Sequence, residues 1–520
     1  MTRRIAILAP FDKTGLADFG LNLAEVGFDI YATSGTQKFL SGAEGLPVNS
    51  ISALTGSPEI LDGRVKTLHP KVHGGILARR DKPDHMAQLK EHGIPPIDLV
   101  CVNLYPFRET ISKAGATLED ALENIDIGGP TMIRAAAKNH PHVLVLVDPE
   151  DYDQALDYLR MEDVPAEYRR YLAAKAFQHV AVYDTIIAEY LRNDPGHADA
   201  VELFPDELTV ALDRVAETRY GENPLQRGAV YRDPMPGAPK GIADAEQLHG
   251  LEMSYLNYFD ADAAWKCAID FDEPACVIVK HATPCGIASD DDIAVAYQRA
   301  YDGDTISPFG GIIAVNREVT WEMTEAMKGK RYDIMIAPAY EERALERLKK
   351  RRDLRILQMP GAAREAFARE YRSILGGMLV QQPDRMRGED VEARVVTKRA
   401  PTARELAELR FAWTCVKHVK SNGVVIVNGR ATVGIGAGQP NRLWPTQQAI
   451  ERAGERIEGA VLASDAFFPF AKGDAVEDAC KAGITAIIQP GGGARDDEAV
   501  EVCDEYGVAM VFTGARAFRH

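Results

Sequence analysis

The chain has few cysteines, and none of them is spaced like a metal-binding or redox pair. Its 520 residues include seven cysteines, at positions 101, 267, 276, 285, 415, 480 and 503. They are scattered, odd in number and form no C-x-x-C pair. Because disulfide frameworks and structural zinc sites require paired thiols at characteristic spacings, the sequence argues against both.

Long apolar runs and an excess of positive charge are also missing. Stretches such as residues 5–9 and 143–147 have the length of a strand, whereas a membrane helix needs about 20 apolar residues. The amino-terminal apolar run is too short for a secretory signal. A net charge of −17 lacks the basic surface of a general nucleic-acid binder, although a local basic pocket remains compatible with small anions. We therefore expect a cytoplasmic enzyme without a membrane segment or a nucleic-acid partner.

The length exceeds what one hydrophobic core usually serves, so at least two domains are expected. In the first part, apolar runs at residues 3–9, 28–32, 48–52, 99–103 and 143–147 alternate with helical stretches. This alternation predicts an α/β domain with a parallel sheet covered on both faces, in which ligands bind at the carboxyl ends of the strands. A long helix is expected at 168–191, and a break at 192–196 places a boundary near residue 200. The expected domains are 1–200 and 201–520.

Two motifs of the first domain suit a phosphate group. Ser34, Gly35 and Thr36 follow a predicted strand and precede a helical segment at 37–40, where backbone N–H groups and the helix dipole favour an anion. The alternative is a simple helix cap. In an extended segment, Arg64 and Lys66 would point to one side and, with Thr67, hold a phosphate. The alternative is an exposed basic loop.

Other side chains of this domain are suited to binding a nucleotide ring or transferring a proton. Asp126 ends a loop, and Lys138 lies on the helix that follows, so the two could meet across a pocket. The alternative is a solvated lysine. Asn103 and Tyr105 come just beyond a predicted strand end, where a nucleotide ring could bind.

In the second region, Lys280 and His281 end the apolar run 276–279. A cationic neighbour favours the neutral imidazole, which is the form that acts as a base, although charge at a strand end is more often only solvated. Residues 434–439 lack the full spacing of a dinucleotide loop. Asp465 lies beside an aromatic cluster at 467–470, which core packing alone does not explain. The segments 276–288 and 424–438 echo one another too weakly to establish a repeat.

Together these segments resemble one family over essentially the whole chain: the bifunctional aminoimidazole carboxamide ribonucleotide (AICAR) transformylase and inosine monophosphate (IMP) cyclohydrolase. The matching stretches are residues 12–15, 64–70, 126–129, 135–140, 219–224, 280–281, 434–439 and 464–470. The resemblance implies a methylglyoxal-synthase-like domain followed by a transformylase region of two cytidine-deaminase-like units, in a homodimer with transformylase sites at the subunit interface. A zinc deaminase is the natural rival, but Cys285 lacks the second cysteine of its P-C-x-x-C motif, so no metal is expected.

The family's chemistry is the end of purine synthesis. A formyl group passes from 10-formyltetrahydrofolate to AICAR, and the product, FAICAR, closes to IMP with loss of water. The resemblance implies that His281 is the general base of formyl transfer, while Lys280 and Asn422 stabilise the formyl oxygen. It implies that Lys138, Asp126 and Tyr105 act in ring closure. The ligand contacts implied are Asp12, Lys13, Thr14, Ser34, Gly35, Thr36, Arg64, Lys66, Thr67, Cys101, Asn103, Arg219, Tyr220, Asp333, Arg442, Asp465 and Arg516, with Asp465 at the folate.

Three positions depart from the family pattern: Phe11 stands for a serine, Leu225 for a histidine and Thr283 for an asparagine. Phe11 and Leu225 put substrate affinity in question, but no proposed catalytic residue is lost. Two other readings stay open. One is an enzyme that retains only formyl transfer. The other is a nucleotide or folate sensor without turnover.

Overall fold

The computed structural model describes residues 4–61, 63–193, 202–361 and 369–520. The chain divides into two compact units: Met1–Leu212 with Asp233–Gly237, and Asp213–Arg232 with Ala238–His520. Residue 3, the expected start of the first strand, lies outside the described residues. So do residues 194–196 of the expected break and the expected boundary near residue 200.

The first unit is built on a five-stranded sheet in the order β3-β2-β1-β4-β5, in which each neighbouring pair is parallel. Consecutive residues of β1 are buried, which requires cover on both faces of the sheet. The five expected strands are confirmed, but the fourth ends at Cys101 and leaves Asn103 in the loop. The strands are β1 (Arg4–Leu8), β2 (Phe28–Ala32), β3 (Val48–Ser50), β4 (Leu99–Cys101) and β5 (Leu144–Leu146).

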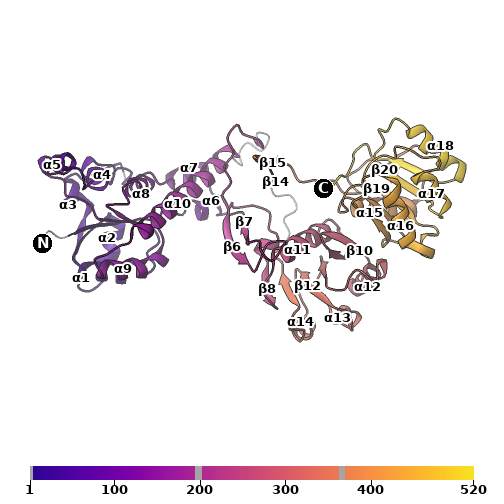
Figure 1. Ribbon diagram of the computed structural model, residues 1–520, viewed down its shortest axis with the longest axis horizontal. Helices are drawn as coiled ribbons and strands as arrows, with labels where there is room; N and C mark the ends of the chain where they lie inside the picture. Colours follow the sequence, from indigo (N-terminus) through magenta and orange to yellow (C-terminus); the bar gives the residue numbers. More distant parts are fainter. Residues whose placement is uncertain (1–3, 62, 194–201, 362–368) are drawn as a thin grey trace. The chain divides into compact units, whose positions relative to one another are not determined.

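The helices of this unit connect and cover the strands (Figure 1). The long α10 lies against α8 and β5, and α1 packs on β2. The expected helix at 168–191 is α10, whereas the one expected at 37–40 begins three residues earlier, at Ser34. The helices are α1 (Leu16–Glu25), α2 (Ser34–Leu40), α3 (Ile51–Thr55), α4 (Pro70–Leu77), α5 (Pro83–Glu91), α6 (Phe107–Ile111), α7 (Leu118–Glu123), α8 (Gly128–Lys138), α9 (Tyr152–Arg160) and α10 (Ala166–Arg192).

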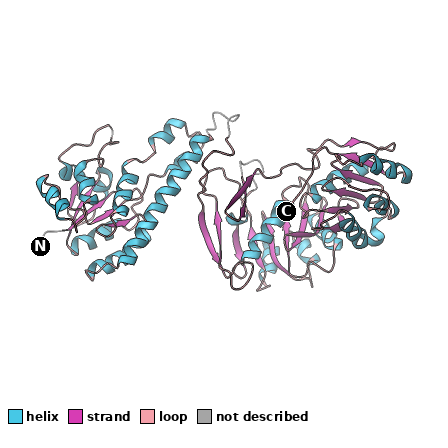
Figure 2. Cartoon of the chain, turned by 45° about the horizontal axis from the view of Figure 1, so that its top comes forward, coloured by secondary structure: helices cyan, strands magenta, loops and turns pink. Residues whose placement is uncertain are grey.

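The second unit is rich in strands and helices (Figure 2). It contains two six-stranded sheets with the same strand order. The first runs β10-β9-β11-β12-β13-β8, and the second, read from its hairpin, runs β18-β17-β19-β20-β21-β16. In both, an antiparallel hairpin is followed by strands that pair in parallel. The two segments that echo weakly in sequence, 276–288 and 424–438, form these hairpins, so the echo marks a structural repeat.

The first repeat comprises β8 (Glu246–His249), α11 (Tyr255–Ala268), β9 (Ala275–Lys280), β10 (Thr283–Ser289), α12 (Ile293–Gly303), β11 (Gly311–Val315), α13 (Trp321–Ala326), β12 (Tyr332–Ala337), α14 (Glu342–Lys349) and β13 (Arg355–Gln358). The second comprises β16 (Arg394–Val395), α15 (Ala403–Val416), β17 (Val424–Val427), β18 (Thr432–Gly436), α16 (Leu443–Ala453), β19 (Val461–Ser464), α17 (Ala475–Lys481), β20 (Ala486–Gln489), α18 (Asp496–Tyr506) and β21 (Ala509–Phe512). Two further hairpins are β6 (Asp213–Thr218) with β7 (Gly228–Arg232), and β14 (Glu370–Ile374) with β15 (Gly377–Gln381).

A buried charge cluster joins the two repeats. Asp270 follows α11 in the first repeat, and its Oδ2 lies 2.6 Å from Lys417 Nζ and 2.6 Å from His418 Nε2 in the second. Burial raises the pKa of Asp270, but the His418 hydrogen bond and the Lys417 charge outweigh it and lower that pKa to about 2. Burial also lowers the pKa of His418. We therefore assign a neutral His418 that donates from Nε2, with Lys417 as the counter-ion.

Replacing Asp270 by asparagine should destabilise the second unit by about 3–5 kcal/mol, because it leaves the buried Lys417 without its counter-charge. Urea unfolding followed by circular dichroism measures the loss. The contribution should persist above the unfolded carboxyl value of 3.8 and disappear as the pH falls towards about 2, since the folded pKa is depressed. The control is Glu217→Gln, which removes a surface pair with Arg214 and should cost under ~1 kcal/mol. Equal losses in both variants would contradict the expectation.

Candidate active sites

The first site lies at the carboxyl edge of the parallel sheet, where the strand order reverses between β1 and β4. Asn103 Oδ1 accepts hydrogen bonds from the backbone N–H groups of Phe11 (2.7 Å) and Asp12 (2.9 Å), which ties the β4 loop to the β1 loop. Thr14 donates to Asp12 Oδ1 from its backbone and its hydroxyl, and these bonds lower the pKa of Asp12. The expected turn at residues 12–15 is therefore a rigid rim beside the strand ends, and Lys13 belongs to it.

One expected ligand contact of this edge points into the protein. Cys101 is 1% exposed, and its Sγ lies 3.3 Å from the hydroxyl of Tyr152. Burial raises the pKa of the thiol to about 12, although the Tyr152 contact works in the opposite direction. The Cys101 side chain is therefore an uncharged packing group at the base of the site.

The start of α2 carries the three residues expected to bind phosphate. Gly35 is open to solvent and has no heavy atom within 4 Å of where a β-carbon would lie, while Thr36 is buried. The hydroxyl of Ser34 donates to Glu59 Oε1 at 2.5 Å. An incoming phosphate would thus have to displace the Glu59 carboxylate from Ser34.

The expectation that Arg64 and Lys66 lie side by side in an extended segment is wrong. Residues 63 and 64 form a turn, closed by a bridge between Ile60 and Val65. Arg64 consequently pairs with Glu123, whereas Lys66 Nζ lies 3.3 Å from the hydroxyl of Tyr105.

Lys66, Tyr105 and Asp126 form an acid–base cluster. Burial raises the pKa of Asp126, while the hydrogen bond from Gly129 N and the charge of Lys66 oppose that rise. Tyr183 on α10 fixes the loop, because its hydroxyl oxygen accepts from Asp126 N at 2.8 Å. Phe11, the departure from the family pattern, lies edge-on to the Tyr105 ring at 6.0 Å between centroids. A cation, a phenol and a carboxyl group with a raised pKa are the groups that proton transfer requires.

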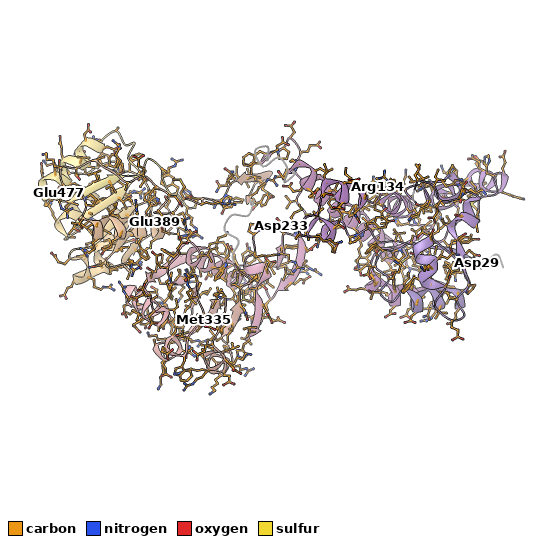
Figure 3. The ribbon with its side chains drawn as sticks, turned by 180° about the vertical axis from the view of Figure 1, so that it is seen from behind. Asp29, Arg134, Asp233, Met335, Glu389 and Glu477 are labelled. Atoms are coloured by element: carbon orange, nitrogen blue, oxygen red, sulfur yellow. The ribbon has the colours of Figure 1, made fainter. Side chains whose placement is uncertain are left out.

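Lys138 does not join this cluster within the chain. Asp126 precedes the first turn of α8, and Lys138 is the last of its 11 residues, so about 15 Å of helix separates them. Lys138 is exposed one turn beyond Arg134, and the Arg134 guanidinium lies over the ring of Phe177 on α10. Arg134 is labelled in Figure 3. The expectation that Asp126 and Lys138 meet across a pocket is therefore wrong for a single chain.

Two glycines at the start of α8 are required by the close approach of this cluster. A β-carbon at Gly128 would lie 2.6 Å from Thr67 Oγ1, and Thr67 is itself buried. One at Gly129 would overlap Asp126 Oδ2 and lie 2.9 Å from Leu104 Cδ2. The glycine pair therefore lets Thr67 and Asp126 pack onto the helix start.

If this unit catalyses the ring closure that the family resemblance implies, replacing Gly129 by alanine should reduce that reaction at least about tenfold, since the new methyl group displaces Asp126 by about 1 Å or more. Conversion of FAICAR to IMP, followed by absorbance, measures the change. Gly74→Ala on α4 is the control, because its methyl group meets the side chains of Ile94, at 3.3 Å from Cδ1, and Leu89, at 3.9 Å from Cδ2, and no backbone atom or candidate site residue is among these contacts. Ring closure at the wild-type rate in the Gly129 variant would show that the position of Asp126 is unimportant.

The second site begins at the β9–β10 hairpin of the second unit. Lys280 Nζ donates to the carbonyl of Phe309 at 2.8 Å, just before β11, and His281 is exposed in the turn. Strand register places Lys280 and the first residues of β11, β12 and β13 along one edge of the sheet.

Three expected ligand contacts gather along this edge. Burial lowers the pKa of Arg355. Asp333, Arg219 and Tyr220 all lie close enough to interact electrostatically with its guanidinium. The Arg219 guanidinium lies over the Tyr220 ring at 5.5 Å. Arg355 was not predicted as a site residue; its guanidinium donates to the carbonyl of Glu252 and lies within electrostatic range of the other three. Leu225, which replaces a family histidine, is fully exposed nearby in sequence.

Asn422 is held by a buried network in the second repeat. Arg442 Nη2 donates to Asn422 Oδ1 at 2.5 Å, and Asn422 Nδ2 donates to the carbonyl of Gln439 at 2.7 Å. Arg442 also forms a buried ion pair with Asp465, which accepts from Ser421 Oγ at 2.6 Å. Asp465 is 0% exposed, so it lies beside the aromatic cluster as the counter-ion of Arg442.

The β9–β10 hairpin and the segment that carries Asn422 both lie near Asp260 on helix α11. Asp260 on α11 accepts from the backbone N–H groups of His281 and Ala282, and the charge of Lys420 reaches the same carboxylate. The structure thus brings His281 close to the segment that carries Asn422. Arg516 is exposed and stacks on Phe518 at 4.8 Å.

Within the described ranges, no group of three or more His, Cys, Asp or Glu side chains is arranged to hold a metal ion. In the same part of the chain, no helix has the length and apolar character needed to cross a bilayer.

A parallel α/β unit with an acid–base cluster, followed by a two-repeat unit with a histidine at its hairpin, defines an enzyme with two sites. The model of an MGS-like domain matches residues 15–131, and that of the AICARFT/IMPCHase bienzyme matches residues 136–452. The chain is 51% identical to the bifunctional purine biosynthesis protein PurH of Halalkalibacterium halodurans, with all of both chains covered. It is 50% identical to PurH of Thermoanaerobacter sp., with 99% of each chain covered. It is 49% identical to PurH of Bacillus subtilis, with both chains covered in full.

The chain belongs to the AICARFT/IMPCHase bienzyme family. It catalyses the last two steps of purine biosynthesis, formyl transfer to AICAR and then cyclohydrolysis to IMP. The first of these activities implies a formyl-folate co-substrate.

Proposed function

We propose that the first unit, expected at residues 1–200, closes the purine ring, and that the second, at residues 201–520, transfers the formyl group from 10-formyltetrahydrofolate. The observation that carries this division is that the Asp126 cluster and the His281 hairpin belong to different compact units. Each unit has its own acid–base groups, so each can catalyse one step.

In formyl transfer, the 5-amino group of AICAR attacks the formyl carbon while His281 removes its proton. The amine is a weak nucleophile because it is conjugated with the ring carboxamide, so proton removal during attack lowers the barrier. Lys280 and Asn422 stabilise the negative charge on the formyl oxygen. The bond from the formyl carbon to N10 of the folate then breaks, N10 takes a proton, and FAICAR and tetrahydrofolate leave. Asp333 lies along the same sheet edge as Lys280, Arg219 and Tyr220 lie within electrostatic range of Arg355 at that edge, and we assign the three to the nucleotide.

In ring closure, the carboxamide nitrogen of FAICAR attacks the formyl carbon, and water is lost. The two reacting groups belong to one molecule, so positioning and modest proton transfer suffice. Asp126 and Tyr105 are suited to move the protons, and the family pattern assigns Lys138 to the same step. Lys66 is the cation that directly contacts Tyr105, so we assign it a larger part than Lys138. Ser34, Gly35 and Thr36 at α2, with the rim at Asp12, Thr14 and Asn103, are placed to hold the nucleotide.

We propose further that the enzyme is a cytoplasmic homodimer. The β14–β15 hairpin supports a second copy as the partner, because it is a separate two-stranded sheet, which is marginally stable alone in water. Its apolar side chains are exposed: Tyr371, Ile374, Leu375, Met378 and Leu379. Burial against a partner subunit would cover them. Sedimentation at micromolar concentration should give twice the chain mass, and a monomer would refute the proposal.

One reaction tests the function. Purified protein is mixed with AICAR and 10-formyltetrahydrofolate, and tetrahydrofolate and IMP are followed separately. Both products should appear in step. Tetrahydrofolate with accumulating FAICAR would mean that only the second unit is active. Neither product, from folded dimeric protein, would favour the sensor.

A further inference from the structure

The turn that carries His281 has an unfavourable backbone. β9 and β10 are joined by only two residues, His281 and Ala282, since Lys280 pairs with Thr283. Both turn residues are left-handed, with φ of 55° and 53°. Two-residue hairpins need this conformation, but a β-carbon disfavours it, so glycine or asparagine is usual there. Neither His281 nor Ala282 meets that preference, so other contacts must hold the turn.

Asp260 supplies those contacts from α11. Its Oδ2 accepts from His281 N at 3.0 Å, and its Oδ1 accepts from Ala282 N at 2.8 Å. Asp260 is 8% exposed and Ala282 only 1%, so the bond to Ala282 is buried, while the bond to the exposed His281 is partly buried. Bonds from backbone amides to a carboxylate are among the stronger hydrogen bonds of proteins. The buried Asp260 side chain therefore hydrogen-bonds to both left-handed residues of the turn.

The second repeat provides an internal comparison. Its hairpin, β17–β18, turns through Gly429 and Arg430, with φ of 60° and 61°. A glycine at the first left-handed position makes that turn intrinsically favourable. The first repeat carries a histidine at the corresponding position. Histidine disfavours this left-handed backbone conformation, but it places an exposed imidazole in the turn. The hydrogen bonds to the Asp260 carboxylate on α11 offset the unfavourable backbone conformation.

We propose that Asp260 is a positioning residue, which holds the left-handed turn and thereby directs the His281 imidazole at the formyl-transfer site. The inference rests on the proposed role of His281. The other charged group near the carboxylate is Lys420, beside Asn422, so the same contact ties the turn to the segment that stabilises the formyl oxygen.

Asp260→Ala should lower kcat for formyl transfer about 10²-fold, with a much smaller change in KM for AICAR, because the base is misplaced while the nucleotide contacts remain. Adding Ala282→Gly should recover about tenfold in kcat, since glycine adopts the left-handed conformation without support. A direct chemical role for Asp260 would give no such recovery, since glycine at position 282 restores no carboxylate, and a merely structural role would lower the folded fraction in urea unfolding while leaving kcat per folded enzyme unchanged. Tetrahydrofolate formation measures both variants.

Three comparisons make the outcome decisive. Asp262→Ala, on the same helix and in an exposed pair with Lys266, should change kcat less than about twofold. If Asp260→Ala does not fold, as judged by urea unfolding, Asp260→Asn keeps one acceptor oxygen and should show a smaller loss with the same recovery by glycine. His281→Ala, measured in parallel, tests the proposed function itself. If His281→Ala keeps formyl transfer, the proposed function is overturned. If His281→Ala loses it but Asp260→Ala keeps it, only the positioning role is overturned. The same holds if His281→Ala loses it and Ala282→Gly gives no recovery.

Discussion

Formyl transfer by the His281→Ala variant is expected to fall about 10²- to 10⁴-fold, which is the usual contribution of a general base. The loss should appear in kcat, because the contacts proposed to hold the nucleotide come from other segments, at Arg219, Tyr220 and Asp333. Ring closure should be unchanged, since Asp126 and its neighbours belong to the other unit. The measurement follows tetrahydrofolate from AICAR, and IMP from FAICAR, with the same preparation.

His249→Ala is the matched control for this variant. His249 ends β8 in the same sheet, and its Nε2 lies 3.2 Å from the carbonyl oxygen of Arg351. Its removal should leave formyl transfer within about twofold of wild type. Formyl transfer at the wild-type rate by His281→Ala would remove His281 from the mechanism. Loss of both activities would contradict independent sites.

The architecture was readable from the sequence where it depended on local pattern. Short apolar runs predicted all five strands of the first unit, because strands buried on both faces carry continuous apolar residues. The weak echo of residues 276–288 in 424–438 also had a structural cause, since the two segments form equivalent hairpins. Only the paired strand orders of the two sheets reveal the repeat, because its core positions accept many different apolar side chains.

The site was predictable as a set of residues but not as an arrangement. A turn at residues 63 and 64 separates Arg64 from Lys66, and alternation along a strand does not anticipate it. Lys138 lies a full helix length from Asp126, although the two belong to neighbouring matching stretches, 126–129 and 135–140. Asp260 was missed because its partners lie 21 and 22 residues away in the chain. The available signal was a pair of aspartates, Asp260 and Asp262, among the alanines of α11; the structure buries only Asp260, and a buried charge requires partners.

Asp126→Asn is expected to lower ring closure about 10²- to 10⁴-fold while formyl transfer continues, so that FAICAR accumulates. Asparagine keeps an acceptor for Gly129 N, which separates the loss of the acid–base group from a loss of loop structure. Burial raises the pKa of Asp126 above the ordinary value of 3.8, so the ionised form is lost at a higher pH than in an ordinary carboxyl group. If the carboxylate is the active form, the rate of wild-type ring closure should fall as the pH is lowered through the raised pKa of Asp126. This acidic limb of the pH–rate profile should be absent from the residual activity of Asp126→Asn. Asp153→Asn, exposed in the first turn of α9, is the control and should behave as wild type. An unchanged acidic limb in the Asp126 variant would assign the titration to another group and shift the proton transfer to Lys66 and Tyr105.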